Sequence, residues 1–400
     1  MEAFEHAHRL GLELQLGPDQ ELRTRAQAMI VRSRWGGAGA YEGSPEAIDA
    51  QFTRIVELLD VASAARARLY GNLALAFGNP HGPVWKSDAI AGRRALELAR
   101  QLDDPDLVSS ALDALTVAEL DDDRLDAAVE LIAVRRTIEH RLTVAERFDI
   151  ANMTAMTQLQ RGNLDVAERA AAQARAGVGA GQAASWSMGA SAWRAIALHA
   201  LGRWDECLAE AGRAERSWAE SELRAPAFAV AGFLAALATA RGLADPDAAA
   251  HLESLTRTLL DRSDPDARNQ RFRAYLDLDL PALERGVLGE HRLFAGRLDY
   301  LHLAASLLAD RRHPADAAGL DRVVAYVEAR GVHLVGAAVR RLRGLVRRDT
   351  EDLTAALAAY EAMGARPFAT RVRTELGILA AEPEAISSGV ASLEAMGDVE

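Results

Sequence analysis

The residue patterns that usually carry out phosphoryl transfer, hydrolysis or metal chemistry do not occur in this sequence. A phosphate-binding P-loop needs a glycine directly before Lys-Ser or Lys-Thr, but Lys86, the only lysine, follows Trp85. The ten histidines include no His-Glu-x-x-His pair, and no Gly-x-Ser-x-Gly turn is present. The sequence therefore predicts no catalytic residue, no metal site and no cofactor, and we expect a protein that is not an enzyme.

Two glycine-rich segments, 36–43 and 177–181, are interpreted as loops. Neither matches the Gly-x-Gly-x-x-Gly fingerprint of dinucleotide binding, and the first follows a helical run where that fingerprint requires a strand. Cys207 is the only cysteine, so an intrachain disulfide and a cysteine zinc site are both excluded. We expect a protein of the reducing cytoplasm.

The charge balance argues against nucleic acid as a direct partner. The chain has 46 basic and 58 acidic residues, whereas nucleic-acid binding needs a basic face that releases phosphate counterions. A membrane span is not expected either, because the longest charge-free apolar run, 225–240, is shorter than ~20 residues and contains Pro226 and Gly232. We predict that this run forms a buried helix.

One basic cluster contains Arg340, Arg341, Arg343, Arg347 and Arg348. On a helix the first, third and fourth of these share one face, while the other two lie on another. A cluster divided in this way is typical of a solvated surface. The alternative is a site for an anionic ligand or an acidic partner.

Helical periodicity runs through most of the chain, and no run of strict alternation indicates a strand. Five prolines stand at the starts of helical runs, each after an Asp, Ser or Glu, as in Asp104-Pro105 and Asp245-Pro246. With 50% hydrophobic residues but only 5% aromatic ones, alanine and leucine fill the core. We predict about twenty helices and no sheet.

The turns between some of these helices repeat. Gly162, Gly202 and Gly242 are 40 residues apart, each at a position suited to a left-handed helix cap. Similar turns are found at 122–128, with Asp123 in place of the glycine, and more weakly at 295–299. Ala128, Ala167 and Cys207 occupy one small-residue position after these turns, where we expect two helices to approach closely.

These turns resemble those of the tetratricopeptide family, whose turn reads Leu-Gly-Asp-Tyr-Glu-Glu-Ala. The period here is 39 to 40 residues instead of 34, and the family's early-helix tryptophan and tyrosine are not clearly present. The resemblance implies an all-α fold, a right-handed α-solenoid of antiparallel helix hairpins. It would form one continuous superhelix over 1–400, with divergent helices in 1–84, repeats in 85–380 and a terminal helix in 381–400.

Residues 356–376 resemble the end of the repeat region in large bacterial regulators, which join a STAND-type ATPase to a nucleotidyl-cyclase or LuxR-type DNA-binding module. This resemblance implies a non-enzymatic binding or sensor module in signalling or transcription regulation. Its partner would be a protein, a peptide or a small-molecule effector on the concave face. The alternatives are an enzyme that uses the helical array as a scaffold, and a scaffold or chaperone adaptor. Since the ATPase motif is missing, the chain would be a fragment or a stand-alone relative.

The first helix of each hairpin lines the concave face in tetratricopeptide arrays, which here implies a binding surface from 148–160 and 186–199. This register leaves Arg194 at a position expected to be apolar, and a shift by one residue would turn Trp193 inward. The tryptophans of this region are interpreted as core, or alternatively as an aromatic pocket. The candidate ligand-binding residues are Asn152, Met156, Trp186, Trp193, Ile196 and His199.

Overall fold

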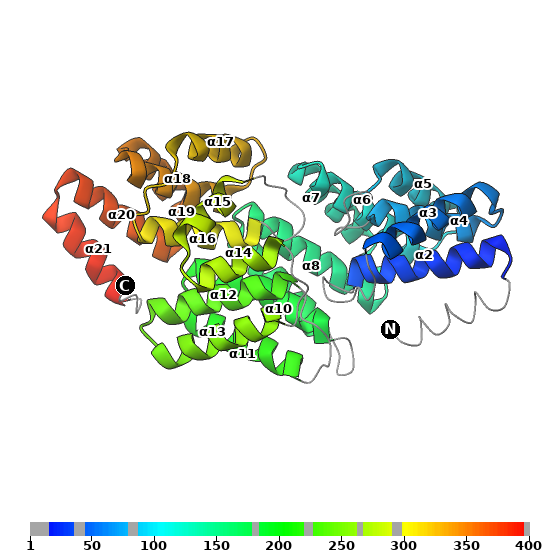
Figure 1. Ribbon diagram of the computed structural model, residues 1–400, viewed down its shortest axis with the longest axis horizontal. Helices are drawn as coiled ribbons and strands as arrows, with labels where there is room; N and C mark the ends of the chain where they lie inside the picture. Colours follow the sequence, from blue (N-terminus) through cyan, green and yellow to red (C-terminus); the bar gives the residue numbers. More distant parts are fainter. Residues whose placement is uncertain are drawn as a thin grey trace. The chain divides into compact units, whose positions relative to one another are not determined.

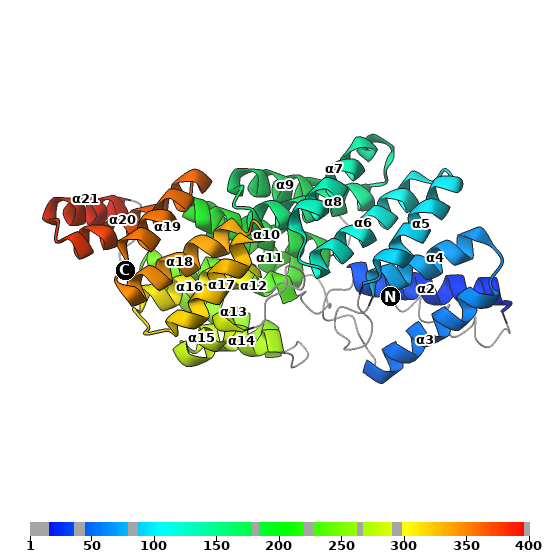
Figure 2. The same cartoon turned by 90° about the horizontal axis from the view of Figure 1, so that it is seen from above.

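The computed structural model describes residues 16–35, 45–78, 87–177, 184–219, 227–261, 267–289 and 298–395. Over these residues the chain forms twenty α-helices and one short 3-10 helix, and no strand occurs among them (Figures 1 and 2). The all-helical prediction is therefore confirmed. Within the same residues, no helix has the length and apolar character needed to cross a bilayer.

The chain divides into two compact units, Met1–Ile150 and Ala151–Glu400, with the boundary inside α8 (Val144–Gln160). The first unit contains α2 (Pro18–Trp35), α3 (Pro45–Val61), α4 (Ala65–Phe77), α5 (Ala89–Gln101), α6 (Pro105–Asp121), α7 (Leu125–Thr137) and the start of α8. After the rest of α8, the second unit contains α9 (Leu164–Gly177), α10 (Ala184–Leu201), α11 (Trp204–Ala219), α12 (Ala227–Gly242), α13 (Pro246–Asp261), α14 (Ala267–Leu276), α15 (Leu280–Leu288), α16 (Leu298–Asp310), α17 (Ala317–Glu328), α18 (His333–Arg347), α19 (Thr350–Met363), α20 (Arg366–Ala380) and α21 (Pro383–Ala395).

The helices begin where local chemistry predicts. Pro105 and Pro246 stand in the first turns of α6 and α13, where a missing N–H has no helical partner to lose. The preceding Asp104 accepts a hydrogen bond from the backbone N–H of Leu107 at 3.2 Å. Asp caps of this kind satisfy N–H groups that the helix itself leaves unpaired.

Two of the three predicted turn glycines adopt the left-handed conformation. Gly162 and Gly202 both have φ of +76°, and Asp123 replaces glycine at φ 60°. The prediction is wrong for Gly242, which is the last residue of α12, while Ala244 takes the left-handed position with φ 48°. In each of these turns the left-handed residue lies two positions before the next helix, so the start of α13 at Pro246 fixes it at Ala244. The weaker turn at 295–299 begins outside the described residues.

The small-residue position is also confirmed. Ala128, Ala167 and Cys207 are all completely buried, and the Cys207 sulfur lies 3.3 Å from the backbone oxygen of Ala195 on the preceding helix. Helices adjacent in the chain pack on each other, and next-but-one pairs such as α2 with α4 and α10 with α12 are also in contact. This pattern is the one expected of a helical-repeat array.

The second unit departs from a purely linear array. In such an array each repeat contacts only its neighbours, but here α20 packs on α10 and α16 packs on α12. Gly202 lies so close to α20 that an added Cβ would stand 2.8 Å from the ring of Pro367. The later helices are therefore folded against the earlier ones within this unit, and they enclose the site described next.

Candidate binding site between α10, α12, α16 and α20

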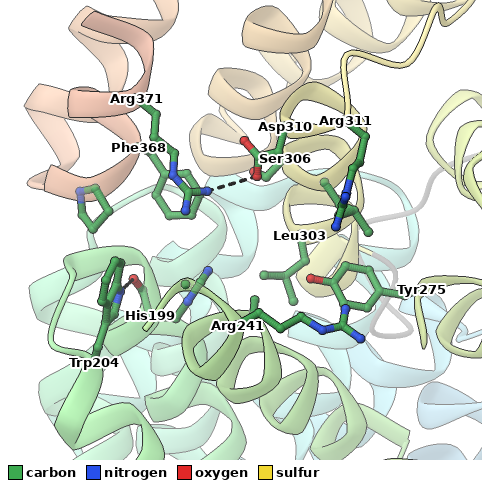
Figure 3. Close-up of a pocket in the computed structure, with 14 residues that line it drawn as sticks. His199, Trp204, Arg241, Tyr275, Leu303, Ser306, Asp310, Arg311, Phe368 and Arg371 are labelled. Atoms are coloured by element: carbon green, nitrogen blue, oxygen red, sulfur yellow. Dashed lines mark hydrogen bonds and ion pairs between the residues drawn. The ribbon is translucent and has the colours of Figure 1, made fainter. Parts of the chain in front are cut away.

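A small cavity lies between α10, α12, α16 and α20 in the second unit (Figure 3). Its volume is about 50 Å³, which suits one or two waters or a single carboxylate-sized group, and is far below the ~300–1,000 Å³ of pockets that enclose whole small molecules. Polar and aromatic side chains converge on it: His199, Arg241, Ser306, Asp310, Arg311 and Arg371, with Trp204, Tyr275 and Phe368.

His199 on α10 is hydrogen-bonded to a threonine. Its Nδ1 lies 2.8 Å from the hydroxyl of Thr239, which also lies 2.9 Å from the backbone oxygen of Ala235 and 3.5 Å from the sulfur of Cys207. The arrangement in which this hydroxyl donates to Ala235 or Cys207 puts the ring hydrogen on Nδ1 and leaves Nε2 as an acceptor. Burial, together with the nearby His302 and Arg371, lowers the pKa of His199 to about 3. The imidazole is thus neutral at physiological pH.

Aromatic rings fix the wall around this histidine. Phe368 from α20 meets the His199 ring edge-on, with 5.6 Å between ring centroids, and stacks on Tyr360 at 5.3 Å. The indole nitrogen of Trp204 donates to the backbone oxygen of His199 at 3.3 Å. These contacts link α10, α11, α19 and α20 around the cavity.

The cavity has an excess of positive charge. Asp310 accepts from Arg371 at 3.0 Å and from the buried Arg341 at 2.6 Å, as Figure 3 shows for the first of these pairs. Arg241 pairs with Glu253 at 3.2 Å. Arg311 has no ion-pair partner within the described ranges. Three arginines and one aspartate therefore line the site in a chain whose net charge is −12.

A buried hydroxyl completes the polar lining. Ser306 on α16 is buried, and its Oγ lies beside the buried hydroxyl of Tyr360, with which it interacts. A group that enters the cavity would compete with Tyr360 for the Ser306 hydroxyl.

The structure brings one of the six predicted ligand-binding residues, His199, to this cavity. Met156 on α8 is buried, and so are Trp193 and Ile196 on α10, which is covered by α9, α11, α12 and α20. Asn152 and Trp186 are half-buried on α8 and α10 and do not line the cavity. The arginines and Ser306 were missed because they come from α12, α16 and α20, outside the two best-matched repeats.

Arg194, which the register placed at an apolar position, is an ion-pair centre. It donates to Glu168 on α9 at 2.8 Å and to Glu210 on α11 at 2.7 Å. Glu210 is fully buried and also accepts from Arg175 and Ser191. Arg194 is accommodated because the neighbouring helices α9 and α11 supply the carboxylates that pair with it. Its side chain thus connects α10 to both of these helices.

The basic cluster of α18 is only in part the solvated surface that its spacing suggested, because Arg347 and Arg348 are exposed while Arg341 is buried. Arg341 is only 2% exposed and binds Asp310 and Glu375, both at 2.6 Å. Arg343 binds Asp352 at 2.6 Å, and Arg340 and Arg347 also pair with acidic residues. Carboxylates from other helices thus neutralise four members of the cluster, while exposed Arg348 has no ion-pair partner among the described residues.

The first unit contains a second group of perturbed charges, in its core. Arg135 is completely buried and contacts Asp113 at 2.7 Å and Asp149 at 2.5 Å, and Arg34 and Glu146 join the same cluster. Burial and the neighbouring Asp149 raise the pKa of Asp113 to about 7, while the arginines lower the pKa of Asp149 to about 2. These groups bind one another from α2, α6, α7 and α8, which is a structural arrangement.

Among the described residues, no group of three or more His, Cys, Asp or Glu side chains is placed to hold a metal ion. Comparison of the sequence with protein-family models and with curated proteins gives no match.

Proposed function

We propose that this protein is a non-enzymatic binding module of the tetratricopeptide-like type, which recognises an anionic group of a ligand or partner at the cavity between α10, α12, α16 and α20. The observation that carries the proposal is the positive lining of three arginines and one aspartate around an open space next to a neutral histidine. The resemblance of 356–376 to bacterial regulators supports a role in signalling or transcription regulation.

The size of the cavity limits what enters it. About 50 Å³ admits one functional group, so the rest of a ligand would lie outside. Arginine guanidinium groups match the paired oxygens of a carboxylate or phosphate. Ser306 would donate to an oxygen of that group, and Nε2 of His199, which only accepts, would bind the O–H of a protonated phosphate but not a carboxylate. Recognition of a phosphate would thus combine charge with two directional hydrogen bonds.

The alternative of an enzyme is less well supported by the same residues. His199 is the natural candidate for a general base, but an imidazole with a pKa of about 3 is too weak a base for proton transfer near neutral pH. Its Nδ1 donates to a threonine, whereas an activated catalytic histidine commonly donates to a carboxylate. These features favour recognition over catalysis.

A titration of the full chain with inorganic phosphate, followed by tryptophan fluorescence, tests the proposal. Because Trp204 lines the cavity, saturable binding should change the emission, and Trp204→Phe should remove most of that change. Arg311 has no ion-pair partner among the described residues, so Arg311→Gln removes a charged donor without breaking an ion pair. This variant should bind phosphate about tenfold more weakly. The exposed Arg216 on α11 does not line the cavity, and Arg216→Gln should bind as the native protein does. Equal affinity in native protein and Arg311→Gln would contradict the proposal.

A further inference from the structure

A second, larger cavity of about 350 Å³ lies between the end of α16, α18 and α20 in the second unit. It shares no lining residue with the cavity of Figure 3. Its volume falls within the ~300–1,000 Å³ typical of small-molecule sites. One part of the lining is purely aliphatic: Pro314, Leu342, Leu345, Val346, Ile378 and Leu379.

Two arginines line the same cavity. Arg312 follows α16 and Arg348 follows α18, both exposed and both in the left-handed conformation, with φ of 49° and 56°. Within the described ranges neither has an ion-pair partner. The lining residues His313 and Glu375 already have partners, because His313 binds Glu284 at 2.9 Å and Glu375 binds Arg341. The cavity thus joins an aliphatic surface to two guanidinium groups that are available to a ligand.

Arg312 and Arg348 differ from the neighbouring arginines of α18 in having no carboxylate partner among the described residues. In this acidic chain the other arginines of the α18 cluster are neutralised by carboxylates, and Arg348 is the member left at the cavity. An arginine after a helix end also interacts favourably with the helix dipole. The dipole accounts for a positive charge at this position but not for the apolar hollow beside it. Ile378, at 43% exposed, is a large aliphatic side chain that a ligand would cover.

We infer that this cavity binds an amphiphilic carboxylate, a monoanion with an aliphatic chain of the fatty-acid class. The carboxylate would be held by Arg312 and Arg348, whose forked donors match its two oxygens. The chain would lie against the leucines, Val346 and Ile378, removing their apolar surface and its own from water. Charge complementarity selects the head group, and the purely aliphatic part of the lining selects a chain over an aromatic ring.

Calorimetric titration of the full chain with octanoate, acetate and 1-octanol tests this inference. Octanoate should bind saturably at this cavity. Acetate, which lacks the aliphatic chain, and 1-octanol, which lacks the carboxylate, should bind there at least tenfold more weakly. The double variant Arg312→Gln/Arg348→Gln should weaken octanoate binding at least tenfold and leave 1-octanol unchanged. Val346→Phe narrows the cavity without changing its charge, so it should weaken the binding of both octanoate and 1-octanol.

The matched control is Arg216→Gln/Arg285→Gln, which removes the same charge from two exposed arginines of the second unit that line neither cavity. It should bind octanoate like the native protein. Arg311→Gln should also leave octanoate binding intact, which separates this site from the proposed anion site. The inference is overturned if octanoate shows no saturable binding to the native protein, or if Arg312→Gln/Arg348→Gln binds it with native affinity while its thermal unfolding is unchanged.

Discussion

Asp113 and Arg135 form an ion pair inside the first unit, with Oδ1 of the aspartate 2.7 Å from Nη1 of the arginine. Both side chains are buried, and Arg34, Glu146 and Asp149 complete their cluster. The three carboxylates exceed the two guanidinium groups by one negative charge. Because burial and Asp149 raise the pKa of Asp113 to about 7, the folded cluster holds a proton that the unfolded chain would release.

Asp113 should make the first unit lose stability as the pH rises from about 4 to about 7. A carboxyl group with a raised pKa stabilises the fold fully below its unfolded value of 3.8, and this contribution is lost as the pH rises through the folded value of about 7. Asp113→Asn removes the titration at nearly constant volume. Urea unfolding at pH 5 and pH 8 should show a smaller loss in this variant than in the native protein.

The exposed aspartate Asp103 provides the control, because its side chain is 93% exposed. Asp103→Asn should keep the native pH dependence. Asp149, with its pKa lowered to about 2, stays ionised throughout this range and loses its contribution only below about pH 4. An unchanged difference between pH 5 and pH 8 in Asp113→Asn would show that Asp113 does not hold the proton.

Replacement of Arg135 should lower the free energy of unfolding far more than replacement of an exposed arginine. Arg135→Met leaves three buried carboxylates with one guanidinium group, and the loss of one partner from a buried ionic cluster costs about 3–5 kcal/mol. Arg147→Met on the exposed side of α8 should change the free energy of unfolding by only about 0.5 kcal/mol. Chemical denaturation at pH 7 measures both, and similar losses in the two variants would refute a structural role of the cluster.

His199 should give the second unit the opposite pH dependence. Its pKa is lowered from 6.5 to about 3, so the unfolded chain binds the proton more tightly and stability is lost as the pH falls below about 6.5. His199→Asn can still donate to Thr239 but does not titrate. Between pH 7 and pH 5 it should lose less stability than the native protein, as measured by urea unfolding. If His199→Asn loses as much stability between pH 7 and pH 5 as the native protein, His199 is not the group that causes this pH dependence.

Cys207 should react slowly with thiol reagents. It is completely buried, and burial raises its pKa to about 12, so the reactive thiolate is scarce in the folded state. Cys207→Ala should change stability by roughly 1 kcal/mol or less, because only a small cavity is left. Cys207→Leu should lower the free energy of unfolding by more, because α10 and α11 are already in contact here and leave no room for the larger side chain. Labelling of the native protein as fast as of the urea-unfolded protein would contradict this assignment.

Local chemistry in the sequence was sufficient to predict the helices and their turns. Gly162 and Gly202 marked left-handed caps, and Ala128, Ala167 and Cys207 marked close helix contacts, because each feature depends on residues nearby in the chain. The prediction for Gly242 was also wrong for a local reason, because the left-handed residue lies two positions before the next helix and is therefore Ala244.

The candidate site could be predicted only in part, because it depends on contacts between distant segments. The spacing of Arg341 suggested a surface position, but Asp310 and Glu375, each more than 30 residues away, pair with it in the interior. The packing of α20 on α10 likewise brings Arg371 and Phe368 towards His199. No periodicity within one repeat encodes that contact, so the tetratricopeptide register identified His199 but none of its partners.

The most direct test of the anion site is the side-chain NMR signal of His199, assigned by its absence in His199→Asn. Before phosphate is added, the nitrogen shifts should report a neutral ring with hydrogen on Nδ1. Titration with phosphate at constant pH and ionic strength should then shift the Nε2 signal saturably in native protein and in Arg216→Gln, and about tenfold more weakly in Arg311→Gln. A His199 signal that phosphate leaves unchanged, or moves equally in Arg311→Gln, would contradict the central claim.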